Sequence, residues 1–473
     1  MRKAILILLV ASLGVGFAAC DLLDPTNVEN PDITEENALN TPNPLQAWKA
    51  GLDRQLAITL NNTLIIAELG TDNYVNTQTF FNQSFDALDI RFTDSDIDDA
   101  FFTMNDLRES ALFGKNTVAP GDPDARADDL AELDFYLGLS HLYLGEYFHS
   151  APLEGSGAPA TSQDHFSAAV DALTDANDSG NGDQTAYKLA LARAHYNQGN
   201  AAEATNFASQ VLAEDAEFVR NAEFDGNNGP TSTLQNALYD RASFDDFQPL
   251  PRLDFLDPKY YNRGPNDESP VAILKAEEAH LILIEAALAD GNLPSAQDQM
   301  KDLIALVESR PVDEIDEEAE GRTNDDPGTR PNASSVVVRS SPDDPFRSDL
   351  VLDRTAQTPV PTVSGTSVTE DIVDGISDAD EAWEIYYLMR QEIFISEGRR
   401  IVDFGIKLPL PQNELLINDA VEEGPATEPI IPSFIADQPL DSFTYDQEAE
   451  EATIDVNMNR VLANNRNSVS PLL

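Results

Sequence analysis

Three short segments share a leucine and glycine pattern that restricts the chain to one kind of helical packing. They are LGLSHLYLG, LARAHYNQG and LIEAALADG, which end at Gly145, Gly199 and Gly291. In each segment a leucine lies eight residues before the glycine, and in the last two an alanine, Ala204 or Ala296, lies five residues after it. A small residue lets two helices approach closely, and glycine suits the turn between them. The pattern predicts stacked helical hairpins.

The same arrangement is typical of tetratricopeptide repeats, although the glycines are spaced more widely than the 34 residues of that repeat. We therefore predict an all-α fold, a tetratricopeptide-like superhelix of helical hairpins with long irregular insertions and minor β hairpins. The hairpins are expected near residues 130–177, 184–214 and 270–309, and the insertions at 218–270 and 311–379. Two β-prone pieces, Val336–Arg339 and Asp349–Asp353, lie in the second insertion. Loops of this length in a compact protein are functional or disordered.

The first residues of the chain have the anatomy of a lipoprotein signal. A positive end at Arg2 and Lys3 precedes an apolar run that ends in two alanines and Cys20, the one cysteine of the chain. Cleavage before Cys20 would leave a terminal cysteine that lipid can modify, and acyl chains would then hold a soluble body on a membrane. Secretion with a free thiol is the alternative. We predict a signal peptide at 1–19, a lipidated tether at 20–44 and a helical body at 45–473.

The charge of the chain excludes some partners. It has 84 acidic and 29 basic residues, a formal net charge of −55, and the acids are spread along its whole length. Nucleic acid is excluded as a general partner, because binding phosphates requires clustered lysine and arginine. Dispersed acids of this kind suit a halophilic source, where salt screens their repulsion. Calcium-loop motifs are missing, so no metal site is predicted.

No motif in the sequence points to catalysis. The chain has no HExxH, GxSxG, P-loop or GxGxxG pattern, and Cys20 is committed to lipid. His141 and His195 fall at the same register, four residues before a turn glycine, which indicates a packing position and not a ligand. We predict no enzymatic activity, no catalytic residue and no cofactor.

Two loops combine amides with aromatic rings, as sites for sugars and peptides do. The first, Glu68–Asn82, follows a helix, and the second is FLDPKYYNRG at 255–264. A helix-capping loop whose rings pack into the core is the alternative for both. The candidate ligand-binding residues of the first loop are Asp72, Asn73, Tyr74, Asn76, Phe80 and Phe81.

The carboxyl-terminal stretch MRQEIFISEGRRIVDFGIKLPLPQNELLIN, residues 389–418, carries a recognisable motif. It resembles the signature of the SusD/RagB-like nutrient-binding lipoproteins, E-G-x-R-x-x-D followed by P-x-P-x-x-E. The matching residues are Glu397, Gly398, Arg400, Asp403, Pro409, Pro411, Gln412, Glu414 and Asn418. Met389 and Ile393 depart from the pattern, because the family helix usually has glutamates there. We expect a structural role for the motif, in which Arg400 and Asp403 pair to fix the turn after the helix that Gly398 ends.

The resemblance implies a non-enzymatic lipoprotein on the outer face of the outer membrane. Such a protein caps a SusC-like TonB-dependent β-barrel and passes it oligosaccharide or peptide fragments. A periplasmic tetratricopeptide scaffold that binds only proteins is the alternative.

Overall fold

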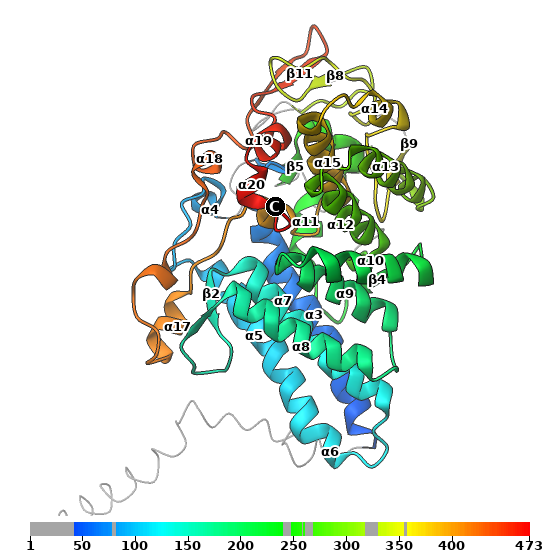
Figure 1. Cartoon of the computed structure of the whole chain (residues 1–473). Helices are drawn as coiled ribbons and strands as arrows, with labels where there is room; N and C mark the ends of the chain where they lie inside the picture. Colours follow the sequence, from blue (N-terminus) through cyan, green and yellow to red (C-terminus); the bar gives the residue numbers. More distant parts are fainter. Residues whose placement is uncertain are drawn as a thin grey trace, which may run out of the picture.

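The computed structural model describes residues 42–77, 82–239, 247–257, 259–260, 268–316, 330–353 and 357–473. Helices dominate these residues, and the strands form small sheets of two or three (Figure 1). The predicted all-α, tetratricopeptide-like fold is confirmed. Cys20 and the predicted signal peptide at 1–19 lie outside the described residues. Within the described residues, no helix combines the length and the apolar composition that a bilayer span requires.

Three antiparallel hairpins form the centre of the superhelix. They are α7 (Ala127–Tyr147) with α8 (Ser162–Asp178), α9 (Gln184–Asn197) with α10 (Ala201–Glu214), and α12 (Ala276–Ala289) with α13 (Leu293–Glu308). Neighbouring hairpins stack through α8 against α9 and through α10 against α12. The stack rises from α7 and α8 to α13 in Figure 1.

The glycines of the repeat pattern have two different roles. Gly199 and Gly291 follow their helices with φ of 75° and 70°, and each makes the expected turn. Gly145 does not, because α7 continues through it to Tyr147. A Cβ atom at Gly145 would lie 2.6 Å from Cε1 of Phe166 on α8. In the first hairpin the glycine therefore permits close helix packing and does not make the turn.

Two long helices precede the hairpins and form their amino-terminal flank. They are α3 (Pro44–Leu69) and α5 (Ser95–Phe113), and both pack against α7. A strand, β1 (Tyr74–Asn76), and a short helix, α4 (Gln83–Asp86), lie between them in sequence. After α5 the chain widens into a π-helical turn, η1 (Gly114–Val118), before the short α6 (Ala119–Gly121).

Small strands pair across the predicted insertions. The first insertion contains β4 (Val219–Ala222), α11 (Thr233–Tyr239), β5 (Phe247–Pro249) and the 3-10 helix η2 (Pro251–Leu256). Its β5 pairs with β1, and β4 pairs with β6 (Val271–Lys275). The strand β6 therefore precedes the third hairpin. Its sequence, VAILK, is buried at every position.

The second insertion contains β7 (Val312–Asp316), β8 (Val337–Arg339), β9 (Gln357–Pro361) and α14 (Glu370–Gly375), and β7 pairs with β9. Asp349–Asp353 is not a strand, although its composition is β-prone. Asp349 has a left-handed φ of 64°, and the Leu352 amide donates to the Asp254 carboxylate at 2.8 Å.

The carboxyl-terminal third returns to the middle of the molecule. Its main helix, α15 (Ala379–Ile393), packs against α12 and against α19 (Met458–Asn464). Ser470, near the end of the chain, donates to buried Glu285 on α12 at 2.5 Å. The remaining short elements are β2 (Ser150–Pro152), β3 (Pro159–Thr161), α16 (Arg400–Asp403), α17 (Gln412–Ile417), η4 (Pro425–Thr427), α18 (Ser433–Ala436), β10 (Phe443–Asp446), β11 (Glu451–Ile454) and α20 (Arg466–Val469).

Candidate functional site

The loop that follows α3 is fixed from inside by its own glutamate. Glu68 is fully buried, and its Oε2 accepts a hydrogen bond from the Asn73 amide at 2.7 Å. Its Oε1 accepts from the backbone N–H of Gly398, in the distant motif, at 2.8 Å. Burial raises the pKa of Glu68 to about 7, against the hydrogen bonds that lower it. The first turn of the loop is therefore attached to the carboxyl-terminal motif.

Asp72 makes a second attachment to the same motif. Its two carboxylate oxygens accept hydrogen bonds from Nε and Nη2 of Arg400, at 2.6 and 3.0 Å. The pair is therefore bidentate. Arg252 of η2 lies 3.5 Å from the same carboxylate. Burial opposes the charge of Asp72, but Arg400 and Arg252 outweigh it and hold the pKa of Asp72 below its usual value. Asp72 therefore stays ionised inside the protein.

The motif pairs differently from our expectation. Arg400 does not pair with Asp403, because its guanidinium reaches Asp72 instead. The Asp403 carboxylate accepts a hydrogen bond from Nε of Arg390, on α15, at 2.6 Å. Each charge of α16 is thus satisfied by another element, and the prediction of a local Arg400–Asp403 pair is wrong. The two pairs join three parts of the chain: the loop after α3, α15 and α16.

The turn between α15 and α16 begins earlier than predicted. The helix α15 ends at Ile393, and the chain then passes Ser396 and Gly398, both with left-handed φ, of 65° and 70°. The carbonyl of Gly398 accepts a hydrogen bond from the Tyr147 hydroxyl at 2.9 Å. A Cβ atom at Gly398 would lie 2.7 Å from that hydroxyl oxygen. A larger residue at this position would have to displace the side chains of Tyr147 on α7 and Leu64 on α3.

Glu397 is the centre of a buried charge cluster with Lys259 and Lys275. The two Nζ atoms lie 2.5 and 2.6 Å from Glu397 Oε1, which also accepts from the Tyr260 hydroxyl at 2.9 Å. Both lysines donate to the carbonyl of Ile393, at the end of α15. Burial, opposed by Glu397, lowers the pKa of Lys259 to about 7. This cluster stops α15 and holds β6 against it.

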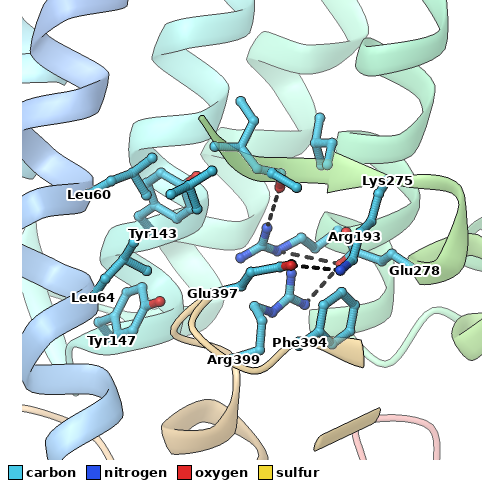
Figure 2. A pocket seen from close by; sticks show the side chains of 14 residues that line it. Leu60, Leu64, Tyr143, Tyr147, Arg193, Lys275, Glu278, Phe394, Glu397 and Arg399 are labelled. Carbon is cyan, nitrogen blue, oxygen red and sulfur yellow. Dashed lines mark hydrogen bonds and ion pairs between the residues drawn. The ribbon is translucent and has the colours of Figure 1, made fainter. Parts of the chain in front are cut away.

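A small cavity lies beside the cluster, lined by side chains from α3, α7, α9, β6, α12 and the motif turn (Figure 2). Arg193 pairs with Glu146, at 2.7 Å from Nε to Oε1, and Arg399 pairs with Glu278 at 2.9 Å. The cavity volume is about 20 Å³, enough for roughly one water molecule. The cavity cannot accept a sugar ring or a peptide, so it is not a ligand pocket. The ion pairs around it support the fold.

The structure buries half of the sequence-predicted ligand residues. Asp72, Asn73 and Tyr74 are each at most 2% exposed, and Tyr74 donates to or accepts from the Ser396 hydroxyl at 2.5 Å. The Tyr74 ring also stacks on Phe247 of β5, with centroids 6.0 Å apart. This burial favours the packing role that the sequence left open for these three residues.

The other candidates of this loop are placed differently. Asn76 ends β1 and is half-buried. Phe80 and Phe81 lie outside the described residues. The described part of the loop is therefore anchored at Asp72–Tyr74.

The second candidate loop contributes Lys259 and Tyr260 to the interior. Lys259 and Tyr260 are 2% and 3% exposed, and both contact Glu397. Pro258 and residues 261–264 lie outside the described residues. For its described part, the packing alternative applies.

The proline-containing half of the motif fixes a neighbouring loop. Pro409 and Pro411 are buried, and the next amide, of Gln412, donates to the carbonyl of Phe92 at 2.7 Å. Glu414 is buried and accepts from the Asn418 side chain at 2.7 Å. This half of the motif attaches the carboxyl-terminal region to the segment before α5.

The two repeat histidines occupy packing positions. His141 lies against His165, with their Nδ1 atoms 3.1 Å apart, and burial lowers the pKa of His141 to about 3. The His195 ring stacks on Phe207 at 5.8 Å. Among the described residues, no group of three or more His, Cys, Asp and Glu side chains could hold a metal ion.

Comparison with solved structures identifies the fold. A SusD-like protein from Bacteroides fragilis NCTC 9343 aligns with 83% of this chain and 98% of its own, with a TM-score of 0.54 and 10% identity. The chain has the SusD-like fold. A SusD superfamily protein from Bacteroides fragilis gives a TM-score of 0.53 at 14% identity, covering 81% of this chain and 99% of that one. A laminarin binding SusD-like protein gives 0.51 at 13% identity, covering 79% and 97%.

These alignments confirm, at the level of the fold, the resemblance that the carboxyl-terminal motif indicates. The sequence matches no family model and no curated protein sequence. Within the SusD-like fold, the motif fastens the loop after α3 to the end of α15.

Sequence reasoning missed the buried partners of the motif. Glu68, Lys259 and Lys275 were not selected, although each contacts Gly398 or Glu397. One signal was present: basic residues are scarce in this chain, and Lys275 ends a strongly apolar run. A lysine in such a run must find a buried carboxylate, because an unpaired buried charge is costly.

Proposed function

We propose that this chain is a non-enzymatic binding lipoprotein of the outer membrane. It is exposed at the cell surface, binds nutrient fragments and delivers them to a SusC-like TonB-dependent transporter. The observation that carries the proposal is the SusD-like fold, which extends over about four fifths of the chain. The motif at residues 397–414 supports it from the sequence. A solved protein of this fold binds laminarin, which favours oligosaccharides over peptides as the fragments.

The anchor in this proposal is Cys20. Removal of residues 1–19 would expose its amine and thiol for acylation, and residues 21–44 would connect the lipid to the start of α3. The attachment is to the membrane surface, since anchoring by acyl chains needs no spanning helix.

For ligand contact we propose that the first residues of the loop after α3 anchor the loop and that its later residues contact the ligand. Asp72, Asn73 and Tyr74 fix the start of the loop through Arg400, Glu68 and Ser396. Asn76, Phe80 and Phe81 then offer the amide and the rings that hold a sugar. Rings supply stacking surface and amides supply hydrogen bonds that select the orientation.

Titration calorimetry of the mature protein in high salt tests this function. The ligands are soluble oligosaccharides from laminarin, cellulose, starch and mannan, and each is analysed for chain length afterwards. We expect saturable binding of at least one series with no shortening of the ligand. The double variant F80A/F81A should reduce the affinity or the number of sites of this binding, whereas F346A, which removes an exposed ring elsewhere, should leave both unchanged. Absence of binding to every series, or hydrolysis of any of them, would reject the proposal.

A further inference from the structure

An open groove lies at the other end of α3 from the loop described above. It is formed where the first turns of α3 meet the end of α5 and the π-helical turn η1, and its volume is about 540 Å³. Small-molecule sites in proteins occupy roughly 300 to 1,000 Å³. The residues that line it are Trp48, Asp106, Glu109, Ser110, Leu112, Phe113, Asn116 and Thr117.

An aromatic pair forms one wall of this groove. The rings of Trp48 and Phe113 have centroids 5.0 Å apart and are tilted by 37°. The indole N–H of Trp48 donates to the carbonyl of Ser110 at 2.9 Å, which fixes the orientation of the ring. Both side chains are half-buried. The wall therefore presents rigid, partly exposed ring surface, which is what a sugar ring needs for stacking.

The backbone beneath the wall has a glycine and a π-helical turn that shape the groove. A Cβ atom at Gly114 would lie 2.8 Å from Cδ1 and Nε1 of Trp48, so the glycine lets the indole lie close to the helix. Gly114 also begins the π-helical turn, which continues to Val118 and brings Asn116 and Thr117 to the groove. Single π-helical turns occur frequently at functional sites.

The polar groups of the groove favour an uncharged ligand. Asp106, Glu109 and Asn116 are exposed, and their oxygens can accept hydrogen bonds from hydroxyl groups. The nearby cations are engaged: Arg108 binds Glu109 at 2.9 Å and Lys115 binds Asp134 at 2.5 Å. An anionic ligand would meet two carboxylates, on a chain of net charge −55. A neutral molecule rich in hydroxyl groups satisfies the same side chains.

We propose that this groove is a second carbohydrate-binding site, in which a sugar ring stacks on the Trp48–Phe113 wall and donates hydroxyl hydrogen bonds to Asp106, Glu109 and Asn116. The inference rests on the proposed function for its class of ligand. Trp48 and Glu68 lie 20 residues apart on one helix, about 30 Å at 1.5 Å per residue. The two sites could therefore hold separate segments of one polysaccharide.

The tryptophan content of the chain makes this site directly observable. The chain has two tryptophans, and Trp383 is only 2% exposed in the core. In the variant W383F, fluorescence emission would report on Trp48 alone. We would titrate full mature W383F and unmodified protein with the same four oligosaccharide series and would measure emission and calorimetric heat together. The variant W48F supplies the control without the reporter, and unmodified protein keeps the test valid if W383F does not fold.

The expected result is a saturable change of emission with at least one series, present in unmodified protein and absent in W48F. The double variant D106A/E109A should weaken the affinity measured by that response by at least about tenfold, because it removes two charged hydrogen-bond acceptors. Binding detected as heat without an emission change would overturn the second site and leave the proposed function intact. Neither heat nor emission change with any series would overturn both.

Discussion

Asp72 and Arg400 form a bidentate ion pair in the interior of the molecule, across 328 residues of sequence. Both side chains are at most 2% exposed, and Arg252 provides a further positive charge 3.5 Å away. Through this pair the loop after α3 depends on the carboxyl-terminal motif. Arg400 of the motif thus holds a distant loop in place.

Removing one partner of this pair should destabilise the protein strongly. R400Q leaves the Asp72 carboxylate buried without its main counter-charge, and breaking a buried pair costs about 3–5 kcal/mol. Denaturant unfolding in high salt would measure the loss. R91Q is the control, because Arg91 and Asp89 form an exposed pair and their separation should leave the midpoint unchanged. An R400Q midpoint equal to that of R91Q would contradict the assigned role.

Gly398 should tolerate alanine worse than another left-handed glycine does. G398A requires a left-handed residue with a side chain, which costs about 1–2 kcal/mol, and it also brings Cβ to 2.7 Å from the Tyr147 hydroxyl. G291A is matched, since Gly291 has the same φ of 70° and no atom within 4 Å of its Cβ position. Thermal unfolding of both variants separates the two contributions. Equal losses would mean that the close approach at Gly398 has no energetic role.

Glu68 should make stability depend on pH in a defined window. Its pKa is about 7 in the folded protein and about 4.3 in an unfolded chain. Between these values the folded state holds a proton that the unfolded state has lost, so stability decreases as pH rises, by up to roughly 1.4 kcal/mol per pH unit. E68Q should remove this slope. We would compare unfolding free energies of both proteins from pH 4 to 8, and parallel curves would refute the assignment.

Salt should stabilise the fold. A net charge of −55 repels itself over a screening length of about 10 Å at 0.1 M salt and about 3 Å at 1 M. The melting temperature should therefore rise steadily with sodium chloride over this range. A variant with exposed acids neutralised, E422Q/E423Q/E448Q, should show a smaller rise. A melting temperature independent of salt would contradict adaptation to a saline medium.

The helical architecture was accessible from the sequence because its determinants are local. Leu191 and Gly199 lie on one helix and its turn, so their spacing indicates the hairpin directly. Gly145 has the same spacing but packs inside a helix, because the residue opposite it, Phe166, decides its role. A pattern within one segment cannot show what another segment brings to it.

The buried network was not accessible for the same reason. Arg400 and Asp403 are neighbours in sequence, which favours a local pair, yet each is closer in space to a charge from another element. Asp72, Asn73 and Tyr74 have the composition of a ligand loop, and only the fold reveals that Glu68, Arg400 and Ser396 already satisfy them. Residues suited to binding a sugar are equally suited to binding each other.

Affinity purification of the mature chain from solubilised envelope membranes, in the salt of its native medium, tests the central claim most directly. We predict that the lipid-modified chain co-purifies with one β-barrel of roughly twice its mass, and that a C20A variant is lost from the membrane fraction. Recovery of only soluble or inner-membrane partners, or an unmodified Cys20 in the cytosol, would contradict this prediction.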